Sequence, residues 1–311
     1  MYNILNNNKP ILYALIKLAI VIGAFYYIFQ KLATNQQLSL FQLQNQLSVL
    51  FAHNIWVIIV LLLFTDVNWL LEIFKWKTLV SAEKEITFMQ AYEQCLASLT
   101  TSLITPNRIR EYGAKTLYFS KGKRKNIMIL NLAGNLSQLS ITIFFGLIGI
   151  LFLFQNFKFQ IPVISKSKII IISIIIVGLF LFRKKLKLHK LKEYFGKLPF
   201  RIYSIVISLS FFRYLVFTHQ FIFLLRLFGV ETDYLILLNL LFCMYFIASI
   251  IPSLSIFDWV IKGSIAVWLF GFIGINELTI VTVTTLMWIL NFAIPALIGS
   301  IFVLNFKPTI N

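Results

Sequence analysis

Residues 105–111 read Thr-Pro-Asn-Arg-Ile-Arg-Glu and interrupt a mostly apolar segment that runs from residue 88 to residue 119. The piece before the interruption is Phe88–Ile104 and the piece after it is Tyr112–Phe119. A helix rises about 1.5 Å per residue and the hydrocarbon core is about 30 Å thick, so neither piece comfortably crosses a membrane. The segment therefore predicts a pair of half-helices that enters and leaves the membrane on one side.

The composition around this segment is that of a membrane protein. Hydrophobic residues make up 59% of the 311 residues, charged residues make up 13%, and the mean hydropathy is +0.86. A soluble domain usually carries about 25% charged residues, and no soluble fold of this length could bury so much apolar surface. The apolar runs are continuous rather than alternating, which favours membrane-spanning helices over strands. The expected fold class is therefore an all-α integral membrane protein.

About six full transmembrane helices are predicted, at residues 11–30, 52–74, 127–155, 165–183, 202–228 and 278–304. The first run is longer than the apolar region of a typical signal peptide and no small-residue cleavage site follows it, so we expect an uncleaved helix. A second interrupted segment, 234–275, is broken by Pro252-Ser253-Leu254-Ser255. Its two halves form either a re-entrant pair or two full spans.

The basic residues predict which side of the membrane each loop occupies. Under this span list, the Lys- and Arg-rich segments 75–85, 120–126 and 183–201 fall on one side, together with both termini. The positive-inside rule places that side in the cytoplasm. We therefore expect a multi-pass protein of the bacterial cytoplasmic membrane with both termini in the cytoplasm. Topology accounts for the net charge of +17, so we expect no nucleic-acid partner.

The order span, broken pair, span then occurs twice in opposite orientations, at about 52–155 and at about 202–304. This is the pattern of an inverted-topology repeat within a single transmembrane domain covering residues 1–311. The helices at 11–30 and 165–183 would be peripheral to it. Each break carries a proline, then an acidic residue, then a lysine four residues later: Glu111 and Lys115 in the first, Asp258 and Lys262 in the second.

The first break supplies the main candidate binding site. Its residues are Thr105, Pro106, Asn107, Arg108, Arg110, Glu111 and Lys115. Thr and Asn cap helix N-termini and Pro favours the first turn, so a half-helix starting here would direct its free N–H groups into the membrane. Helix N-termini and arginine side chains both bind phosphate. This pattern indicates a site for a phosphate-bearing headgroup; the alternative is a cytoplasmic loop whose charges reach the interface.

The second break and two spans supply further candidates. Ser253, Asp258 and Lys262 would either line a central cavity or form a self-neutralised helix start, since Asp258 and Lys262 are four residues apart. Asp66 and Arg213 lie in equivalent spans of the two repeats. Ionisable groups inside a membrane nearly always face the protein interior, so we expect these two to pair with each other or with the half-helix charges.

Other polar side chains receive plainer interpretations. Glu72 is expected at the cytoplasmic interface, and Trp76 is expected in the interfacial aromatic belt. Three polar residues at helical spacing indicate bonding between helices: Asn131, Asn135 and Gln138. No cysteine–histidine ligand cluster or other cofactor motif is present, so we expect no metal or cofactor.

The stretch Thr105–Gly113 resembles the Thr-Pro-Gly-Gly-x-Gly-Glu-x-x-Gly-type motif of the lysylphosphatidylglycerol synthase transmembrane region family, and Pro252–Asp258 resembles that family's second motif. The resemblance covers residues 10–304. It implies an inverted-repeat fold with two re-entrant elements and a role in moving polar lipids. Asn107, Arg108 and Arg110 replace the motif's glycines, which puts the headgroup preference in doubt. No aminoacyl-transferase domain follows the motif, so we expect no synthase activity.

The leading hypothesis is therefore a translocase, or flippase-like protein, for an anionic phospholipid or a polyprenyl phosphate. One alternative is a membrane-embedded lipid-linked transferase, although no Asp-x-Asp pair, zinc motif or clustered carboxylates support an enzyme. The other is a non-transporting membrane subunit of a lipid-modifying or envelope-assembly complex, with an enzyme docked on loop 183–201. A homo-oligomer is compatible with each hypothesis.

Overall fold

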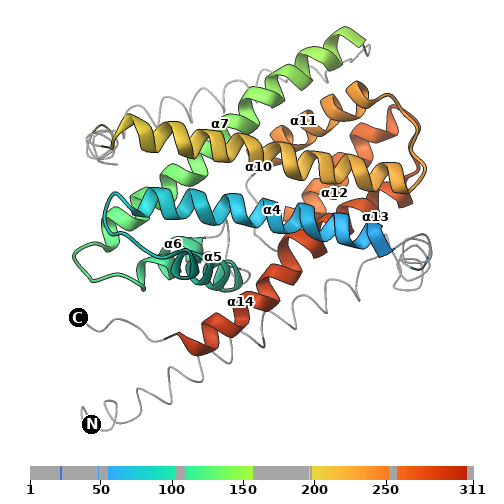
Figure 1. Ribbon diagram of the computed structural model, residues 1–311. Helices are drawn as coiled ribbons and strands as arrows, with labels where there is room; N and C mark the ends of the chain where they lie inside the picture. The colour runs from blue at the N-terminus through green and yellow to red at the C-terminus, as the bar shows by residue number, and fades with distance from the viewer. Residues whose placement is uncertain are drawn as a thin grey trace, which may run out of the picture.

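The computed structural model describes residues 55–102, 109–156, 198–251 and 258–306, together with the isolated positions 22, 48 and 196. These residues form helices joined by short turns, without a strand among them. The helices are α4 (Ile55–Val80), α5 (Phe88–Ser102), α6 (Ile109–Thr116), α7 (Arg124–Asn156), α10 (Phe200–Leu227), α11 (Tyr234–Ile250), α12 (Asp258–Gly271), α13 (Glu277–Trp288), the π-helical turn η1 (Ile289–Ala293) and α14 (Ile294–Asn305) (Figure 1).

Four of these stretches are long and apolar enough to cross a membrane: α4, α7, α10 and the continuous segment Glu277–Asn305. They correspond to the spans predicted at 52–74, 127–155, 202–228 and 278–304. The predicted helices 11–30 and 165–183 lie outside the described residues. The large side chains on the outer faces of α4 and α7 are exposed and apolar, for example Leu63, Phe144 and Leu151. This arrangement is the one expected of a multi-pass helical membrane protein.

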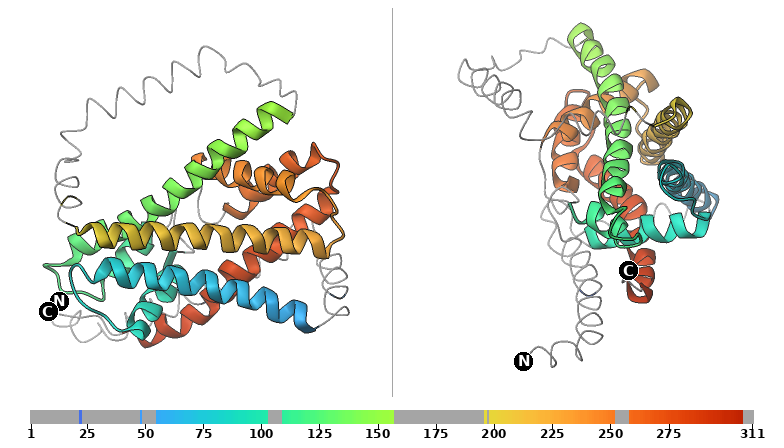
Figure 2. Two further views of the ribbon diagram at one scale, coloured as in Figure 1. Left: turned by 45° about the horizontal axis from the view of Figure 1, so that its top comes forward. Right: turned by 90° about the vertical axis from the view of Figure 1, so that its left-hand side faces the viewer.

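Both interrupted segments contain two short helices. In the first, α5 ends at Ser102 and α6 begins at Ile109, three residues earlier than the predicted restart at Tyr112. In the second, α11 has 17 residues and α12 has 14, and both are shorter than the roughly 20 residues that a span needs. The pair α5 and α6 lies toward one end of the bundle, and the pair α11 and α12 lies toward the other (Figures 1 and 2).

Polar caps define where several of these helices begin and end. Thr87 and Gln90 form a reciprocal capping box at the start of α5, with the Thr87 N–H donating to Gln90 Oε1 at 2.9 Å. The Asp233 carboxylate accepts the N–H of Leu235 at 2.8 Å and so begins α11. Gly229 ends α10 at a φ of 76°, a conformation that L side chains rarely adopt. These caps explain why the chain reverses at these turns.

Three helix pairs pack most extensively: α7 with α11, α4 with α10, and α5 with α14. Two of these crossings depend on a glycine. A Cβ at Gly149 of α7 would lie 2.7 Å from the Asn239 carbonyl oxygen of α11, and a Cβ at Gly299 of α14 would collide with the Leu96 carbonyl of α5. The missing side chains therefore let the backbones approach closely.

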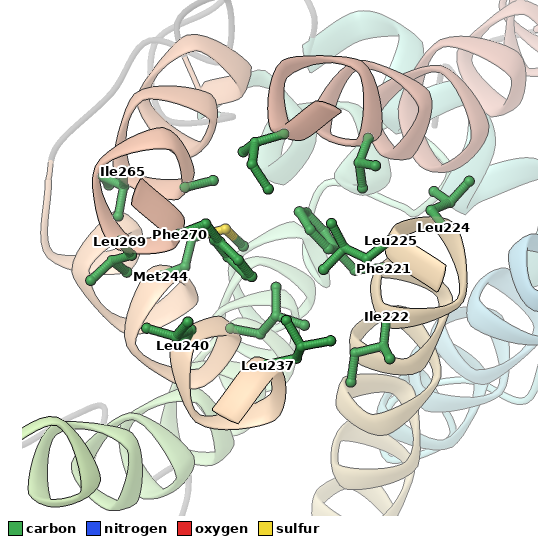
Figure 3. Packing of buried hydrophobic residues seen from close by; sticks show 14 of the residues in the cluster. Phe221, Ile222, Leu224, Leu225, Leu237, Leu240, Met244, Ile265, Leu269 and Phe270 are labelled. Carbon is green, nitrogen blue, oxygen red and sulfur yellow. The ribbon is translucent and has the colours of Figure 1, made fainter. Parts of the chain in front are cut away.

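Each half of the chain has its own apolar core. Phe221 and Leu225 of α10 pack with Leu240 of α11 and with Leu269 and Phe270 of α12 (Figure 3). A second cluster gathers residues of α4, α5 and α7 around the buried Trp76. A smaller aromatic cluster, centred on Trp259, Trp288 and Phe292, lies against Leu99 and joins the two halves. Polar groups of the site described next lie between these cores.

Candidate functional site

An ion triad connects α4 and α10, which lie side by side (Figures 1 and 2). The carboxylate oxygen Oε2 of Glu72 contacts Lys75 Nζ at 2.6 Å and Arg213 Nη1 at 2.7 Å. The side chains of Lys75, Glu72 and Arg213 are 2%, 13% and 20% exposed. Removing the Glu72 carboxylate would leave two cations without their anionic partner in a low-dielectric interior, which is costly. The triad is therefore a unit with two cations on one anion.

A chain of amides extends from this triad into the last span. Arg213 Nε donates to Asn68 Oδ1 at 3.1 Å, and Asn68 Nδ2 donates to Asn291 Oδ1 at 2.8 Å. Asn291 Nδ2 donates to Gln220 Oε1 at 2.8 Å, and Gln220 Nε2 donates to the Thr65 hydroxyl at 3.0 Å. Asn68, Gln220 and Thr65 are buried. Asn291 thus connects α4, α10 and η1 through one side chain.

The backbone around Asn291 departs from a regular α-helix. Asn291 lies in the π-helical turn, and Pro295 follows in the first turn of α14. Proline has no N–H, so it removes a donor to the turn before it. The Trp69 indole Nε1 supplies a donor here, bonding the Asn291 carbonyl oxygen at 3.2 Å. Short π-helical turns within long helices occur frequently at functional sites.

A second buried cation lies in the first half of the chain. Lys115 of α6 is 1% exposed, and its Nζ donates to Asn131 Oδ1 of α7 at 2.9 Å. The same Nζ lies 4.4 Å from the ring centroid of Trp76. Trp76 in turn donates its Nε1 proton to Gln94 at 2.8 Å. The buried Lys115 amine is therefore stabilised by the amide oxygen of Asn131 and by the aromatic face of Trp76.

A cavity of about 600 Å³ opens beside the ion triad. Its polar lining consists of Asn68, Gln138, Thr142, Arg213, Ser249, Lys262, Thr284 and Asn291. Its apolar lining is largely aromatic, with Phe217, Phe221, Trp259, Trp288 and Phe292. A cavity with a cationic, amide-bearing region and an aromatic wall can bind an anion that carries an apolar substituent.

The structure describes some of the site residues predicted from the sequence and not others. Thr105, Pro106, Asn107, Arg108 and Ser253 lie outside the described residues. The backbones of Arg110 and Glu111 belong to α6 and that of Asp258 begins α12, but their side chains are not among those described. Arg213 and Lys262 both line the cavity. Lys115 is not among the lining residues and contacts Asn131 of α7 and the ring of Trp76.

The structure corrects several expectations about single residues. Asp66 is exposed, and Arg213 forms its ion pair with Glu72 rather than with Asp66. The alternative partners, Arg108, Arg110 and Glu111, have side chains that lie outside the described ones. Glu72 is accordingly an interior residue rather than an interfacial one. Trp76 is 1% exposed instead of lying in the aromatic belt, and Lys75, expected in a basic loop segment, is buried in the triad. For Glu72, Lys75 and Trp76, the neighbouring helices α5, α7 and α10 pack against this part of α4 and cover the side chain.

The expected bonding from the polar stripe on α7 is found at two positions. Asn131 accepts from Lys115, and Gln138 Nε2 donates to the Ser210 carbonyl at 3.3 Å. The sequence interpretation missed Gln220 and Asn291. A signal for both was present in the sequence, because each is an amide side chain inside an apolar span, Gln220 in 202–228 and Asn291 in 278–304. Asn291 is also followed four residues later by Pro295.

No protein-family model, curated protein or solved structure matches this chain. The geometry of the cavity and the triad is therefore the basis for assigning a function.

Proposed function

We propose that the protein translocates an anionic lipid headgroup, that of a phospholipid or a polyprenyl phosphate, across the bacterial cytoplasmic membrane. The observation that carries this proposal is the cavity that places Arg213 and Lys262 against an aromatic wall. Such a lipid needs both a cationic contact for its phosphate and an apolar surface for its chain. Transporters of this general type bind their substrates near the middle of the membrane, between two repeats.

An inverted repeat is part of the proposal, and the packing pairs support it. In the proposed repeat, α4, α5, α6 and α7 correspond to α10, α11, α12 and α13–α14, respectively. Each packing pair then has a counterpart: α5–α14 corresponds to α11–α7, and α6–α7 corresponds to α12–α13. The pair α4–α10 is its own counterpart. Gly149 and Gly299 occupy corresponding crossings. Rocking of one repeat against the other would open the cavity to alternate sides.

The orientation in the membrane is also proposed. The turns after α4 and before α7 contain Lys84, Lys121 and Lys123, and they lie at the end where α10 begins and α14 ends (Figure 2). The turn between α10 and α11, at the opposite end, contains Glu231 and Asp233. The positive-inside rule assigns the first end, where α14 ends, to the cytoplasm. With the helix predicted at 11–30, the N-terminus would lie on the same side.

Membership of the lysylphosphatidylglycerol synthase transmembrane region family belongs to the same proposal. It rests on the motif at 105–113, and the two broken helix pairs at opposite ends are compatible with the architecture that the family implies.

Translocation by the purified protein in proteoliposomes tests the function. Fluorescent phosphatidylglycerol that reaches the outer leaflet is bleached by a membrane-impermeant reductant. We expect wild-type protein to move the lipid and Arg213→Gln to be at least about tenfold slower, because a charge-assisted hydrogen bond contributes about 1.5–3 kcal/mol. Arg226→Gln is the matched control, since Arg226 is exposed at the end of α10 and, among the described residues, bonds the Val230 carbonyl.

Equal rates for wild type and Arg213→Gln, or for wild-type and empty vesicles, would contradict the proposal. Turnover of a lipid by the purified protein would indicate a transferase instead. A single stoichiometric partner in the absence of transport would indicate a membrane subunit of a larger complex.

A further inference from the structure

Arg213 uses only part of its donor set within the protein. Its Nε bonds Asn68 and its Nη1 bonds Glu72, whereas Nη2 has no partner among the described residues. The same side chain lines the cavity. A guanidinium holds phosphate through two parallel N–H bonds, so a phosphate bound by Nη1 and Nη2 of Arg213 would share Nη1 with Glu72 and compete with that carboxylate for the same positive charge.

Glu72 can release Arg213 without becoming an unpaired charge. Its Oε2 atom also contacts Lys75, which lies three residues later on the same helix and is almost completely buried. This second contact is local to α4, whereas the contact with Arg213 joins α4 to α10. A carboxylate that retains Lys75 remains neutralised, which avoids the large cost of an isolated buried charge.

From this arrangement we infer that Glu72 is a resident competitor for the anionic group of the substrate. It occupies Arg213 when the cavity is empty, and it yields the guanidinium when a phosphate enters and remains paired with Lys75. This inference rests on the proposed function and assigns the phosphate position within the site, next to Arg213.

The same geometry defines the class of headgroup. Two side chains on the cavity wall are cationic, Arg213 and Lys262, and none of the described lining residues is a carboxylate. A phosphate headgroup that carries no amine could contact both Arg213 and Lys262. A headgroup amine would face those cations without an acidic partner among the described lining residues. The site therefore selects phosphatidic acid, phosphatidylglycerol or polyprenyl phosphate over phosphatidylethanolamine and aminoacylated lipids.

The test measures binding to the full-length protein in detergent through tryptophan fluorescence, because Trp259 and Trp288 line the cavity. The probes are short-chain phosphatidic acid, phosphatidylglycerol, phosphatidylethanolamine and inorganic phosphate. We expect the first two lipids to bind, phosphatidylethanolamine to bind at least about tenfold more weakly, and inorganic phosphate to compete only weakly.

The decisive variant is the double substitution Glu72→Gln/Lys75→Met. It removes one negative and one positive charge, so the net charge of the triad is unchanged while Arg213 loses its competitor. We expect its affinity for phosphatidic acid to rise several-fold and its rate of lipid release in proteoliposomes to fall. Glu83→Gln is the control, because Glu83 lies in the turn after α4 and bonds Asn126. If the double variant does not fold, Glu72→Asp takes its place, since the shorter carboxylate would stay near Lys75 and withdraw from Arg213.

Unchanged or weaker phosphatidic acid binding by the folded variant would overturn the inference, even if transport depends on Arg213. Equal competition by inorganic phosphate would overturn the assignment of a lipid headgroup. Tighter binding together with an absence of transport by wild type would uphold the competitor role of Glu72 and refute translocation.

Discussion

At the residue scale, charges on the same helix have different environments. Asp66 and Glu72 both lie on α4, yet Asp66 is exposed whereas Glu72 binds two cations. The difference arises because the helix face that carries Glu72 meets α10, from which Arg213 extends. Single residues inside this bundle are therefore defined by the helix that they face, and the amide of Asn291 is the clearest case because it joins three helical elements.

Asn291→Leu is expected to destabilise the protein. The substitution keeps the branched shape in a larger side chain, and it leaves Asn68 Nδ2 and Gln220 Oε1 without their partner at Asn291. An unsatisfied buried polar group costs about 1–3 kcal/mol, so the thermal midpoint of the detergent-purified protein should fall by several degrees. Asn156→Leu is the control, because that exposed amide bonds only its own helix, at the Phe152 carbonyl. Equal midpoints for the two variants would show that the amide chain contributes little.

At the element scale, the close crossings of α7 with α11 and of α14 with α5 hold the two halves together. Each crossing places a glycine against a carbonyl of the partner helix. Thr100 adds a hydrogen bond of 2.7 Å from its hydroxyl to the Ala296 carbonyl across the second crossing. Since the apolar environment of a membrane gives little drive for helix association, close backbone packing of this kind is an important source of stability.

Gly149→Ala is expected to weaken the α7–α11 crossing. The new methyl group would lie 2.7 Å from the Asn239 carbonyl oxygen, so the helices would have to separate. Overpacking of this kind costs about 1–3 kcal/mol. It should lower the yield of monodisperse protein in size-exclusion chromatography and the midpoint of thermal unfolding. Gly271→Ala provides the comparison, because a Cβ there meets open space and should change stability by less than about 0.5 kcal/mol. A loss of similar size in both variants would argue against the close crossing.

At the scale of the whole molecule, the basic and acidic turns lie at opposite ends of the bundle. A single cysteine introduced into each turn can report the side of the membrane on which that turn lies. Cys95 and Cys243 are buried, so labelling by a membrane-impermeant maleimide should come mainly from an introduced cysteine.

Glu231→Cys is expected to be labelled in intact cells. Lys123→Cys, which lies in the basic turn before α7, should be labelled only after the membrane is permeabilised. The reverse pattern would invert the proposed orientation and place the α5–α6 pair on the outside.

The amino-acid sequence by itself determined four described spans and where the two interrupted segments break, because apolar run length and polar interruptions act locally along the chain. The predicted span 127–155 is the helix Arg124–Asn156, and the interruption at 105–111 lies where α5 has ended and α6 begins. The sequence also indicated Arg213 and Lys262 as intramembrane cations, since any charge within an apolar run is conspicuous.

Only the tertiary structure decided which of these charges share a site. Glu72, Lys75 and Arg213 form one triad because α4 and α10 pack together, although Arg213 lies far from the other two in sequence. Asn291 became central for the same reason, since its partners come from two other helices. Local patterns identify where a polar group lies along a helix, but its partner depends on how distant helices pack, and that is settled by the summed contacts of the whole bundle.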